Sequence, residues 1–419
     1  MAQERVEQAC KAATDAKKIP GVAAIALDRS GKQLFKGAYG VTNLNDASTA
    51  KPITSSTPFM IWSCTKIVTS VCALQLVEQG KLQVDDLVEK YVPEIANVKV
   101  IDGFNDDGSP KLREQKTKAT VLMLMTHTAG FAYDFFDPTT LAYRTYMKQT
   151  PAAYASGERH YFFDTPILFD PGSRYNYGTN TDWLGFVVEA ISGLKLNEYI
   201  QKNILDPLGM KDSGSQIKGG SFADKGALIH FRGEDGSLVA NAAMALAENP
   251  DVYGGGHFLY STLDDYSTFL LTLLNGGTEP RSGVQILKKE TVSEYLFEDQ
   301  IHKICSADGI GEIDTTIPML SLKGTFLPGQ NKGWSCGLML NEGSLKGRSA
   351  GSGSWAGLGN LYFWIDPKGG KLGLIMTGIL PFMDREVLHL FDELERAVYG
   401  HEPSKEIGED GGNYGVSKL

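Results

Sequence analysis

The first 18 residues of the chain carry apolar side chains that recur at helical spacing. These positions are Val6, Cys10, Ala13 and Ala16. The spacing puts them on one face, which predicts an amphipathic helix packed against the rest of the protein. Because charged residues run through the whole stretch, it does not resemble a signal peptide.

Apolar, β-rich runs follow this helix and return near the other end of the chain. Residues 22–43 predict two strands joined by a polar turn, and residues 358–378 repeat this arrangement around Asp-Pro-Lys-Gly-Gly. An amphipathic helix is predicted over 385–400, where a glycine ends it. The tail, 401–419, is polar and glycine-rich, and we expect it to be frayed.

The middle of the chain has a different pattern. From Ser63 to about residue 275, most apolar side chains recur with a period of 3.6, and most of these runs end at glycine or asparagine. Strands at both ends with helices between them predict an α+β protein. We expect a mixed sheet domain built from residues 1–62 and 276–400, a mostly helical domain over 63–275, and a site in the cleft between them.

The composition is that of an ordinary globular protein. The 419 residues, 42% hydrophobic and 21% charged, suggest about two or three domains. A formal net charge of −10 argues against nucleic acid or an anionic membrane as partner. No apolar run approaches the ~20 residues of a membrane-spanning helix. Five scattered cysteines without a C-x-x-C pair favour a reducing, cytoplasmic setting and indicate neither a disulfide framework nor a zinc site.

The pattern Ser-x-x-Lys, a candidate nucleophile and base, occurs four times. The pairs are Ser48/Lys51, Ser63/Lys66, Ser192/Lys195 and Ser215/Lys218. One or two matches are roughly the chance expectation in a chain of this length, so spacing alone decides nothing. Three of the pairs fall in loops or across the end of a helix. Only Ser63 begins a sustained helical pattern.

Three features favour the Ser63–Lys66 pair: the spacing on one helical face, the electrostatic field of the helix N-terminus and the apolar cover of the amine. At the start of a helix, residues i and i+3 project from one face about 5–6 Å apart, so hydroxyl and amine can meet. The helix N-terminus offers backbone N–H groups and partial positive charge to an oxyanion. An amine under apolar cover loses affinity for its proton and can act as a base. The structural alternative has Ser63 capping the helix and Lys66 in solvent.

A second proton carrier is expected to serve the leaving group. The segment DPGSRYNYGTNTDW, just before another predicted helix, offers Tyr175 and Tyr177. Taken alone, both tyrosines fit a role as core aromatic residues. Other motifs in the chain bear on whether one of these tyrosines lies beside Ser63 and Lys66.

Motifs along nearly the whole chain resemble those of the serine β-lactamase and penicillin-recognising superfamily. Besides Ser63-Cys64-Thr65-Lys66, they are IPGVAAIALDRSG, ALQLVEQGKLQVDD, IDGFNDDGSPKLREQ, LMTHTAGF, PGSRYNYGTNTDWLG, DPLGM and WAGLGNLYFWIDPKGG. The resemblance is to its class C-like branch, the family VIII carboxylesterases and the lovastatin-type fungal acyltransferases. It implies a β-lactamase-like fold, with a central antiparallel sheet flanked by the N- and C-terminal helices. It also implies Ser63 as nucleophile, with Lys66 and Tyr177 sharing the base and acid roles.

The chain departs from the β-lactamase pattern in two places. Tyr177-Gly178-Thr179 lacks the asparagine of the family at the third position, although Asn180 follows. Trp355-Ala356-Gly357 stands where a Lys-Thr/Ser-Gly triad is expected, close to the Trp-Gly-Gly of the esterases. Losing that lysine removes the cation for a β-lactam carboxylate, which favours an uncharged ester. The resemblance further implies the Leu358 N–H as second oxyanion donor, and Gly357 would allow close approach of an acyl group.

A rival serine lies in Gly347-Arg348-Ser349-Ala350-Gly351, which matches the G-x-S-x-G nucleophile elbow. Asp366 or Asp384, followed by His389, would supply the required chain order. The elbow needs a strand before the serine and a helix after it, whereas this segment follows a polar stretch and precedes a strand. We interpret it as a glycine-rich connection.

Other residues suit the surroundings of a site. His127 is expected to hydrogen-bond buried backbone and not a metal, since no second ligand stands at suitable spacing. Gly254-Gly255-Gly256 is interpreted as a turn where the backbone passes near the cleft. An apolar acyl pocket is expected from aromatic residues, some of which must be core: Trp62, Phe131, Tyr133, Phe135, Phe136, Tyr253, Trp355 and Trp364. Of the aromatic residues, Trp355, Tyr133 and Tyr253 are the candidates for substrate contact, together with Ala356.

These residues predict a serine hydrolase that needs no cofactor or metal. The favoured activity is a carboxylesterase that forms an acyl-enzyme at Ser63 from a small or medium ester or thioester. The alternative is an acyltransferase that passes the acyl group to an alcohol or amine of a secondary metabolite. Two further alternatives are a β-lactamase and a catalytically silent binding homologue. The expected partners are small molecules, not nucleic acid or a membrane.

Overall fold

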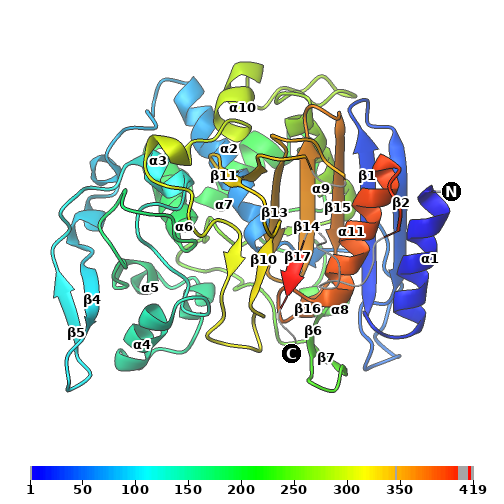
Figure 1. The fold of residues 1–419 in the computed structure, drawn as a ribbon, viewed down its shortest axis with the longest axis horizontal. Helices are drawn as coiled ribbons and strands as arrows, with labels where there is room; N and C mark the ends of the chain where they lie inside the picture. Colours follow the sequence, from blue (N-terminus) through cyan, green and yellow to red (C-terminus); the bar gives the residue numbers. More distant parts are fainter. Residues whose placement is uncertain (1, 345–346, 404–413, 417–419) are drawn as a thin grey trace.

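The fold is built on an antiparallel sheet of seven strands (Figure 1). The computed structural model describes residues 2–344, 347–403 and 414–416. In the order in which they pair, the strands are β11 (Lys332–Trp334), β12 (Met339–Asn341), β13 (Gly353–Gly357), β14 (Leu361–Asp366), β15 (Lys371–Met376), β1 (Gly21–Asp28) and β2 (Gln33–Gly40). The two hairpins predicted from opposite ends of the sequence therefore lie side by side, with Ile25 of β1 opposite Leu374 of β15.

Shorter strands form small sheets around the main one. They are β3 (Phe59–Met60) with β8 (Tyr260–Ser261); β4 (Val100–Phe104) with β5 (Pro110–Arg113); β6 (Ile229–Arg232) with β7 (Leu238–Asn241) and β16 (Ile379–Leu380); and β10 (Gly324–Phe326) with β9 (Glu312–Ile313) and β17 (Tyr414–Val416). Two of these small sheets adjoin the region around Ser63, because β3 directly precedes the turn that carries Ser63 and β9 contributes Ile313 to a pocket that Ser63 also lines.

The helices lie mostly between the two sets of main strands in the sequence. They are α1 (Ala2–Asp15), α2 (Thr65–Glu78), α3 (Val121–Met125), α4 (Pro138–Tyr146), α5 (His160–Phe163), α6 (Asn180–Ser192), α7 (Leu196–Ile200), α8 (Phe222–Lys225), α9 (Leu263–Leu274), α10 (Lys289–Leu296) and α11 (Arg385–Tyr399). Single helical turns are η1 (Trp62–Cys64), η2 (Val88–Lys90), η3 (Pro93–Asn97), η4 (Ala153–Ser156) and η6 (Ile301–Lys303), with a π turn, η5 (Gln201–Leu205). None of the helices in the described part of the chain has the length and apolar character needed to cross a membrane.

The terminal helices α1 and α11 pack against each other and against the sheet, and α9 covers its other face (Figure 1). The apolar face predicted for α1 is buried at Val6, Cys10 and Ala13, whereas Ala16 lies beyond the helix and is exposed. Gly400 ends α11 with φ +77°, a conformation that glycine adopts without strain. The predicted α+β fold, a central antiparallel sheet flanked by the terminal helices, is confirmed.

The tail differs from its prediction in one short stretch. Residues 414–416, which the sequence placed in a frayed tail, form β17 and pair with β10. The ring of Tyr414 is 3% exposed, and its phenol lies 3.3 Å from the Arg348 guanidinium. Burying the aromatic ring of Tyr414 against the edge of β10 stabilises this short strand despite the polar residues around it. The average composition of the tail does not reveal such a single buried residue.

The predicted division into domains stays a prediction, although one helix crosses it. Helix α9 lies within the segment 63–275 that the sequence assigned to the helical domain. It packs against β1, β14 and β15 of the main sheet. Helical period alone identifies an apolar face but says nothing about which element covers it.

Helix α2 runs through the centre of the protein. All its residues from Thr65 to Leu76 are buried, and it packs on α6 and α7. A helix that is apolar nearly all round belongs in a core. Its second residue, Lys66, is therefore carried into the interior by the helix on which it sits.

Candidate active site

Ser63 lies in η1, the turn that joins β3 to α2. The turn is anchored on both sides, since Ile61 N donates to Leu259 O (3.0 Å) and the Tyr266 hydroxyl donates to Cys64 O (2.8 Å). Trp62 has φ +46°, a region that costs an L-residue energy and that the anchored backbone imposes. Ser63 is half-buried between buried neighbours and does not cap either helical segment. The capping interpretation of Ser63 is therefore wrong.

Lys66 is 1% exposed, and its amine is enclosed by three oxygen atoms. It lies 3.2 Å from Ser63 Oγ, 2.8 Å from the Tyr133 hydroxyl and 3.1 Å from Gly256 O. The alternative of a solvated lysine is wrong. Burial lowers the pKa of Lys66 from 10.5 to about 7, although the nearby charge of Asp182 acts to raise it. At neutral pH a large share of this amine is free to accept a proton.

The glycine turn before β8 holds the lysine from the other side. Asp182 of α6, 1% exposed, accepts a hydrogen bond from Gly256 N (3.0 Å), and the carbonyl of the same glycine accepts from Lys66. A Cβ on Gly256 would lie 2.9 Å from the Lys66 amine and 3.0 Å from Asp182 Oδ2. The structure therefore confirms that the backbone at 254–256 passes close to the cleft, and a side chain at position 256 would have to displace the Lys66 amine.

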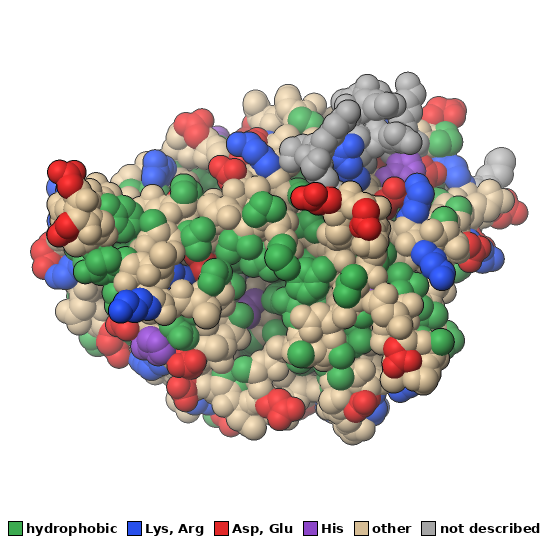
Figure 2. All heavy atoms as spheres, turned by 90° about the horizontal axis from the view of Figure 1, so that it is seen from below, with side chains coloured by type: hydrophobic (Ala, Val, Ile, Leu, Met, Phe, Trp, Pro, Cys, Tyr) green, Lys and Arg blue, Asp and Glu red, His purple; other side chains and the backbone are tan. Residues whose placement is uncertain are grey.

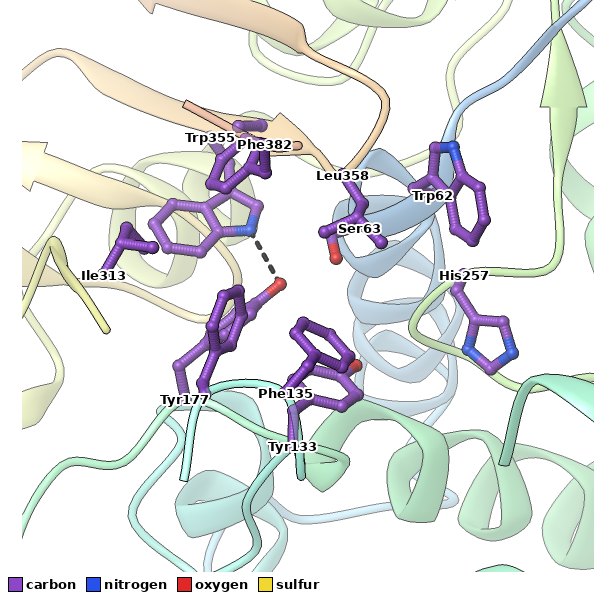
Figure 3. Close-up of a pocket in the computed structure, with 12 residues that line it drawn as sticks. Trp62, Ser63, Tyr133, Phe135, Tyr177, His257, Ile313, Trp355, Leu358 and Phe382 are labelled. Atoms are coloured by element: carbon purple, nitrogen blue, oxygen red, sulfur yellow. Dashed lines mark hydrogen bonds between the residues drawn. The ribbon is translucent and has the colours of Figure 1, made fainter. Parts of the chain in front are cut away.

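Tyr177 occupies the turn just before α6. Its hydroxyl accepts a hydrogen bond from the Trp355 indole N–H at 3.0 Å (Figure 3). Burial raises the pKa of Tyr177 above its ordinary value, and hydrogen bonds with Ser63 and Trp355 act to lower it. The ring also lies beneath the amine of Lys66, whose Nζ is 4.8 Å from the ring centroid. The structure thus brings Ser63, Lys66 and Tyr177 together.

The tyrosine turn is pinned by the segment that contains His127. Asn176 N donates to His127 O (2.8 Å), and Gly178 N lies 3.5 Å from His127 Nδ1, which confirms that this ring binds buried backbone. Burial holds the pKa of His127 well below its usual range, so the ring is neutral. Asn180 contacts His127 Nδ1 at 3.1 Å and supports the turn. Tyr175 is buried against Trp334 and lies outside the pocket.

A hollow open to solvent lies in front of Ser63, and the empty space within it and at its mouth together is about 480 Å³. Its lining residues are Trp62, Ser63, Tyr133, Phe135, Phe136, Tyr177, His257, Ile313, Trp355, Ala356, Leu358 and Phe382. Hydrophobic side chains gather around a hollow in the face shown in Figure 2. None of the twelve lining residues is aspartate, glutamate, lysine or arginine, so the pocket suits an uncharged, apolar ligand.

Most of the residues predicted to contact substrate line this hollow, but two do not. Trp355, Ala356, Leu358 and Tyr133 are at the wall. Tyr253 instead packs on Phe258, outside the lining. Gly357 is also outside it, and a Cβ there would lie 2.4 Å from Ile61 O. The absence of a side chain at Gly357 lets β13 approach the turn that carries Ser63. This corrects the interpretation that Gly357 makes room for an acyl group.

The aromatic residues predicted for the pocket divide between wall and core. Trp62, Phe135 and Phe136 line the hollow. Phe131 stacks on Trp183, and Trp364 packs on Phe391, both in the core.

Three wall residues were not predicted from the sequence. His257 follows directly after three glycines, the last of which binds the Lys66 amine, a position that could have drawn attention to it. Ile313 and Phe382 come from β9 and from the loop after β16, respectively. Nothing local in those two segments signals a site, because only the packing of distant strands brings them to the hollow.

The rival serine, Ser349, has no nucleophile elbow around it. It lies in the connection between β12 and β13, with no helix after it. Its N–H donates to Asp366 (3.0 Å), and Asp384 caps α11. The preceding Arg348 forms a buried ion pair with Glu395 at 2.7 Å. The segment is therefore a connecting loop, as the sequence indicated, and Asp366 and Glu395 hold it in place.

The other three Ser-x-x-Lys pairs are not brought together as Ser63 and Lys66 are. Each lysine amine donates to a distant backbone carbonyl instead. The contacts are Lys51 to Asp224 O (2.6 Å), Lys195 to Asp251 O (3.0 Å) and Lys218 to Lys211 O (2.6 Å). All three amines therefore bind away from their serines.

Comparison with known proteins gives consistent matches over nearly the whole chain. A family model described as Beta-lactamase matches residues 6–392. Monacolin J acid methylbutanoyltransferase of Aspergillus terreus is 28% identical over 404 residues, which cover 94% of this chain and 95% of that protein. Lovastatin esterase of Penicillium rubens is 29% identical over 385 residues, 88% of this chain and 92% of that protein. Among solved structures, a mutant of simvastatin synthase from Aspergillus terreus gives a TM-score of 0.81 at 27% identity, with 94% of each chain covered.

Proposed function

The chain belongs to the β-lactamase family, and from this premise we propose that it is a serine acyltransferase that forms an acyl-enzyme at Ser63. Its donor is a small or medium ester or thioester, and its acceptor is an alcohol or amine. Hydrolysis by water is the competing outcome at the same intermediate.

The observation that carries the proposal is the contact of the Ser63 hydroxyl with a buried amine whose pKa is lowered to about 7. In acylation, the neutral amine of Lys66 takes the serine proton while Oγ bonds to the acyl carbon. The oxyanion is held by the backbone N–H groups of Ser63 and Leu358. The bond to the leaving group then breaks, and that group leaves with a proton from Tyr177, which Lys66 restores.

Deacylation reverses these roles with a new partner. The acceptor hydroxyl or amine loses its proton to Tyr177 and Lys66 as its oxygen or nitrogen bonds to the acyl carbon. The bond to Ser63 breaks, and Oγ regains a proton. No cofactor is needed at any step of this cycle.

Acyl transfer is favoured over the plain carboxylesterase that the tryptophan motif suggested. Relatives that match over nearly their full length include a methylbutanoyltransferase as well as an esterase. The hollow in front of Ser63 is walled by aromatic and aliphatic side chains, which suit an organic acceptor better than water. A β-lactamase is disfavoured because no lysine or arginine side chain lines the hollow to hold a carboxylate.

Intact mass spectrometry tests the proposal directly. The protein is mixed with p-nitrophenyl and N-acetylcysteamine acyl donors, with and without a panel of alcohols and amines. We expect a mass increase equal to one acyl group, located on Ser63, which disappears faster when a suitable acceptor is present. Absence of any adduct with every donor would contradict the proposal. An adduct lost at one rate regardless of acceptor would leave an esterase.

A further inference from the structure

We propose that the loop between β9 and β10, residues 314–323, holds together the wall against which the acceptor binds, and that Thr316 is the residue that positions this wall. The inference rests on the proposed acyl transfer from Ser63. It names the class of acceptor, an alcohol with a bulky apolar group, and the segment of the chain that selects it.

The acceptor lies on the side of Ser63 where Tyr177 stands. In the proposed cycle it loses its proton to the Tyr177 hydroxyl, so its reacting oxygen must lie beside that group. Figure 3 shows Ile313 and Phe382 on the same side of Ser63 as Tyr177, and both line the hollow. The body of the acceptor therefore packs against Ile313 and Phe382.

The β9–β10 loop connects three wall residues that come from separate parts of the chain. Ile313 directly precedes the loop, at the end of β9. Thr316 N donates to Phe135 O at 3.0 Å. At its other end the loop exchanges two backbone hydrogen bonds with Phe382, of 2.9 and 3.0 Å. Ile313, Phe135 and Phe382 all line the hollow, so a movement of the loop changes the distances between them.

Thr316 attaches the loop to a part of the protein that is itself held firmly. Besides its N–H, the Thr316 hydroxyl donates to Asp134 O at 2.5 Å. The Asp134 carboxylate is buried, pairs with Arg144 at 3.1 Å and accepts a hydrogen bond from Ala152 N at 2.8 Å. Because that partner is fixed, loss of the Thr316 hydroxyl should loosen the loop and not the segment that the loop binds.

The wall selects an acceptor by its apolar surface. The side chains of Ile313, Phe135 and Phe382 are buried hydrocarbon groups at the edge of the hollow. An apolar acceptor group that packs against them leaves water, which favours binding. Methanol has little apolar surface to bury there. Benzyl alcohol should therefore be a better acceptor than methanol at the same concentration.

The test uses vinyl butanoate as donor, because its leaving group is small. Ser63 takes the butanoyl group, and vinyl alcohol leaves and becomes acetaldehyde. The acyl-enzyme then yields an ester with the added alcohol or butanoic acid with water, and chromatography measures the ratio of the two products. Both the preference for benzyl alcohol and its dependence on the loop are read from this ratio.

Thr316→Val removes the hydroxyl and keeps the shape of the side chain. The variant should lower the ester-to-acid ratio with benzyl alcohol by roughly three- to tenfold, the size of one neutral hydrogen bond, through a higher KM for this acceptor. The ratio with methanol, and the release of acetaldehyde without an added alcohol, should stay within about twofold. A role confined to general stability would not separate the two alcohols.

Thr315→Val is the matched control on the same loop. The Thr315 hydroxyl has no hydrogen-bond partner among the residues that the structure describes, so this variant should keep the wild-type ratio. An unchanged ratio in Thr316→Val, an equal fall in both variants, or an equal fall with both alcohols would overturn the inference. A wild-type preference for methanol would overturn it as well.

Mass spectrometry of the wild-type protein separates this inference from the proposed function. A butanoyl adduct on Ser63 together with any of those contrary ratios rejects the role of the loop and leaves the acyl-enzyme standing. An adduct that yields only butanoic acid with both alcohols rejects the inference and leaves an esterase. If no adduct forms, the proposed function fails and the inference with it.

Discussion

The amine of Lys66 lies closer to the Tyr133 hydroxyl, at 2.8 Å, than to the hydroxyl of the serine it is proposed to activate, at 3.2 Å. A second phenol, Tyr177, faces the same amine with its ring and hydrogen-bonds Ser63. Two tyrosines therefore flank one lysine, and they touch different partners. We therefore expect Tyr133 to position the amine, whereas Tyr177 contacts Ser63, the proposed nucleophile.

Replacing each tyrosine separately distinguishes these two roles. Tyr177→Phe should lower kcat for acylation by about 10²–10⁴-fold, the usual loss when a proton carrier is removed. Tyr133→Phe should cost only about tenfold, since it removes one neutral hydrogen bond to Lys66. Stopped-flow release of p-nitrophenolate measures both. A larger loss in Tyr133→Phe than in Tyr177→Phe would exchange the roles.

Ser63→Ala should eliminate both turnover and labelling by a serine-directed phosphonate. The hydroxyl is the only group removed, so the circular dichroism spectrum and the thermal unfolding temperature should change little. Ser349→Ala is the matched control, and it should keep full activity because that serine lies in a loop between two strands. Loss of activity in the control alone would assign the nucleophile to Ser349.

The pH dependence of acylation should report the state of Lys66. With a folded pKa of about 7, the amine is protonated below that pH and free above it, so kcat/KM should rise through pH ~7 and then level off. Asp182→Asn removes a charge that raises this pKa and should move the rise to lower pH. The pH–rate profile of the variant checks this. A shift to higher pH would show that the carboxylate does not act on Lys66 through its charge.

The same lysine should make stability depend on pH. Its pKa is lowered from 10.5 to about 7 on folding, so below pH ~7 the full cost of burying the charge is present. The cost disappears as pH rises toward 10.5. Lys66→Met should therefore raise the melting temperature at pH 6 by at least about 2 °C, and the gain should shrink by pH 10. Calorimetry at both values tests the prediction, and a gain that grows with pH would contradict it.

Nitrocefin should be a poor substrate. The hollow has no lysine or arginine among its lining residues, so the carboxylate of a β-lactam finds no such partner there. Its kcat/KM should fall at least about 100-fold below that for p-nitrophenyl butanoate, the equivalent of a lost charged contact of ~3 kcal/mol. Comparable rates for the two substrates would mean that another group holds the carboxylate.

The elements predicted from the sequence are those encoded locally. The hairpins at 22–43 and 358–378 and the helix ended by Gly400 follow from period and turn residues, and all are present. Ser63 and Lys66 meet because three residues of one helical start separate them. Tyr177 was placed beside them only by resemblance to a family, since no local pattern brings a distant turn to that point.

What the sequence did not predict depends on contacts between distant segments. Ile313 and Phe382 reach the pocket because strands far apart in the chain pack together. Gly357 was assigned to the substrate, but the carbonyl of Ile61 occupies the space beside it. The contact between Tyr133 and Lys66 spans 67 positions in the chain. A single sequence carries no measure of such distances.

The short strand formed by residues 414–416 connects the C-terminal part of the chain to the wall of the hollow in front of Ser63. It pairs with β10, whose other neighbour, β9, contributes Ile313 to that wall. A protein truncated soon after Gly400 would lack this strand. The edge of β10 would then be exposed, and the Arg348 guanidinium would lose its contact with the Tyr414 hydroxyl. Versions that lack residues 414–416 should therefore not be used to judge which acyl donors the protein accepts.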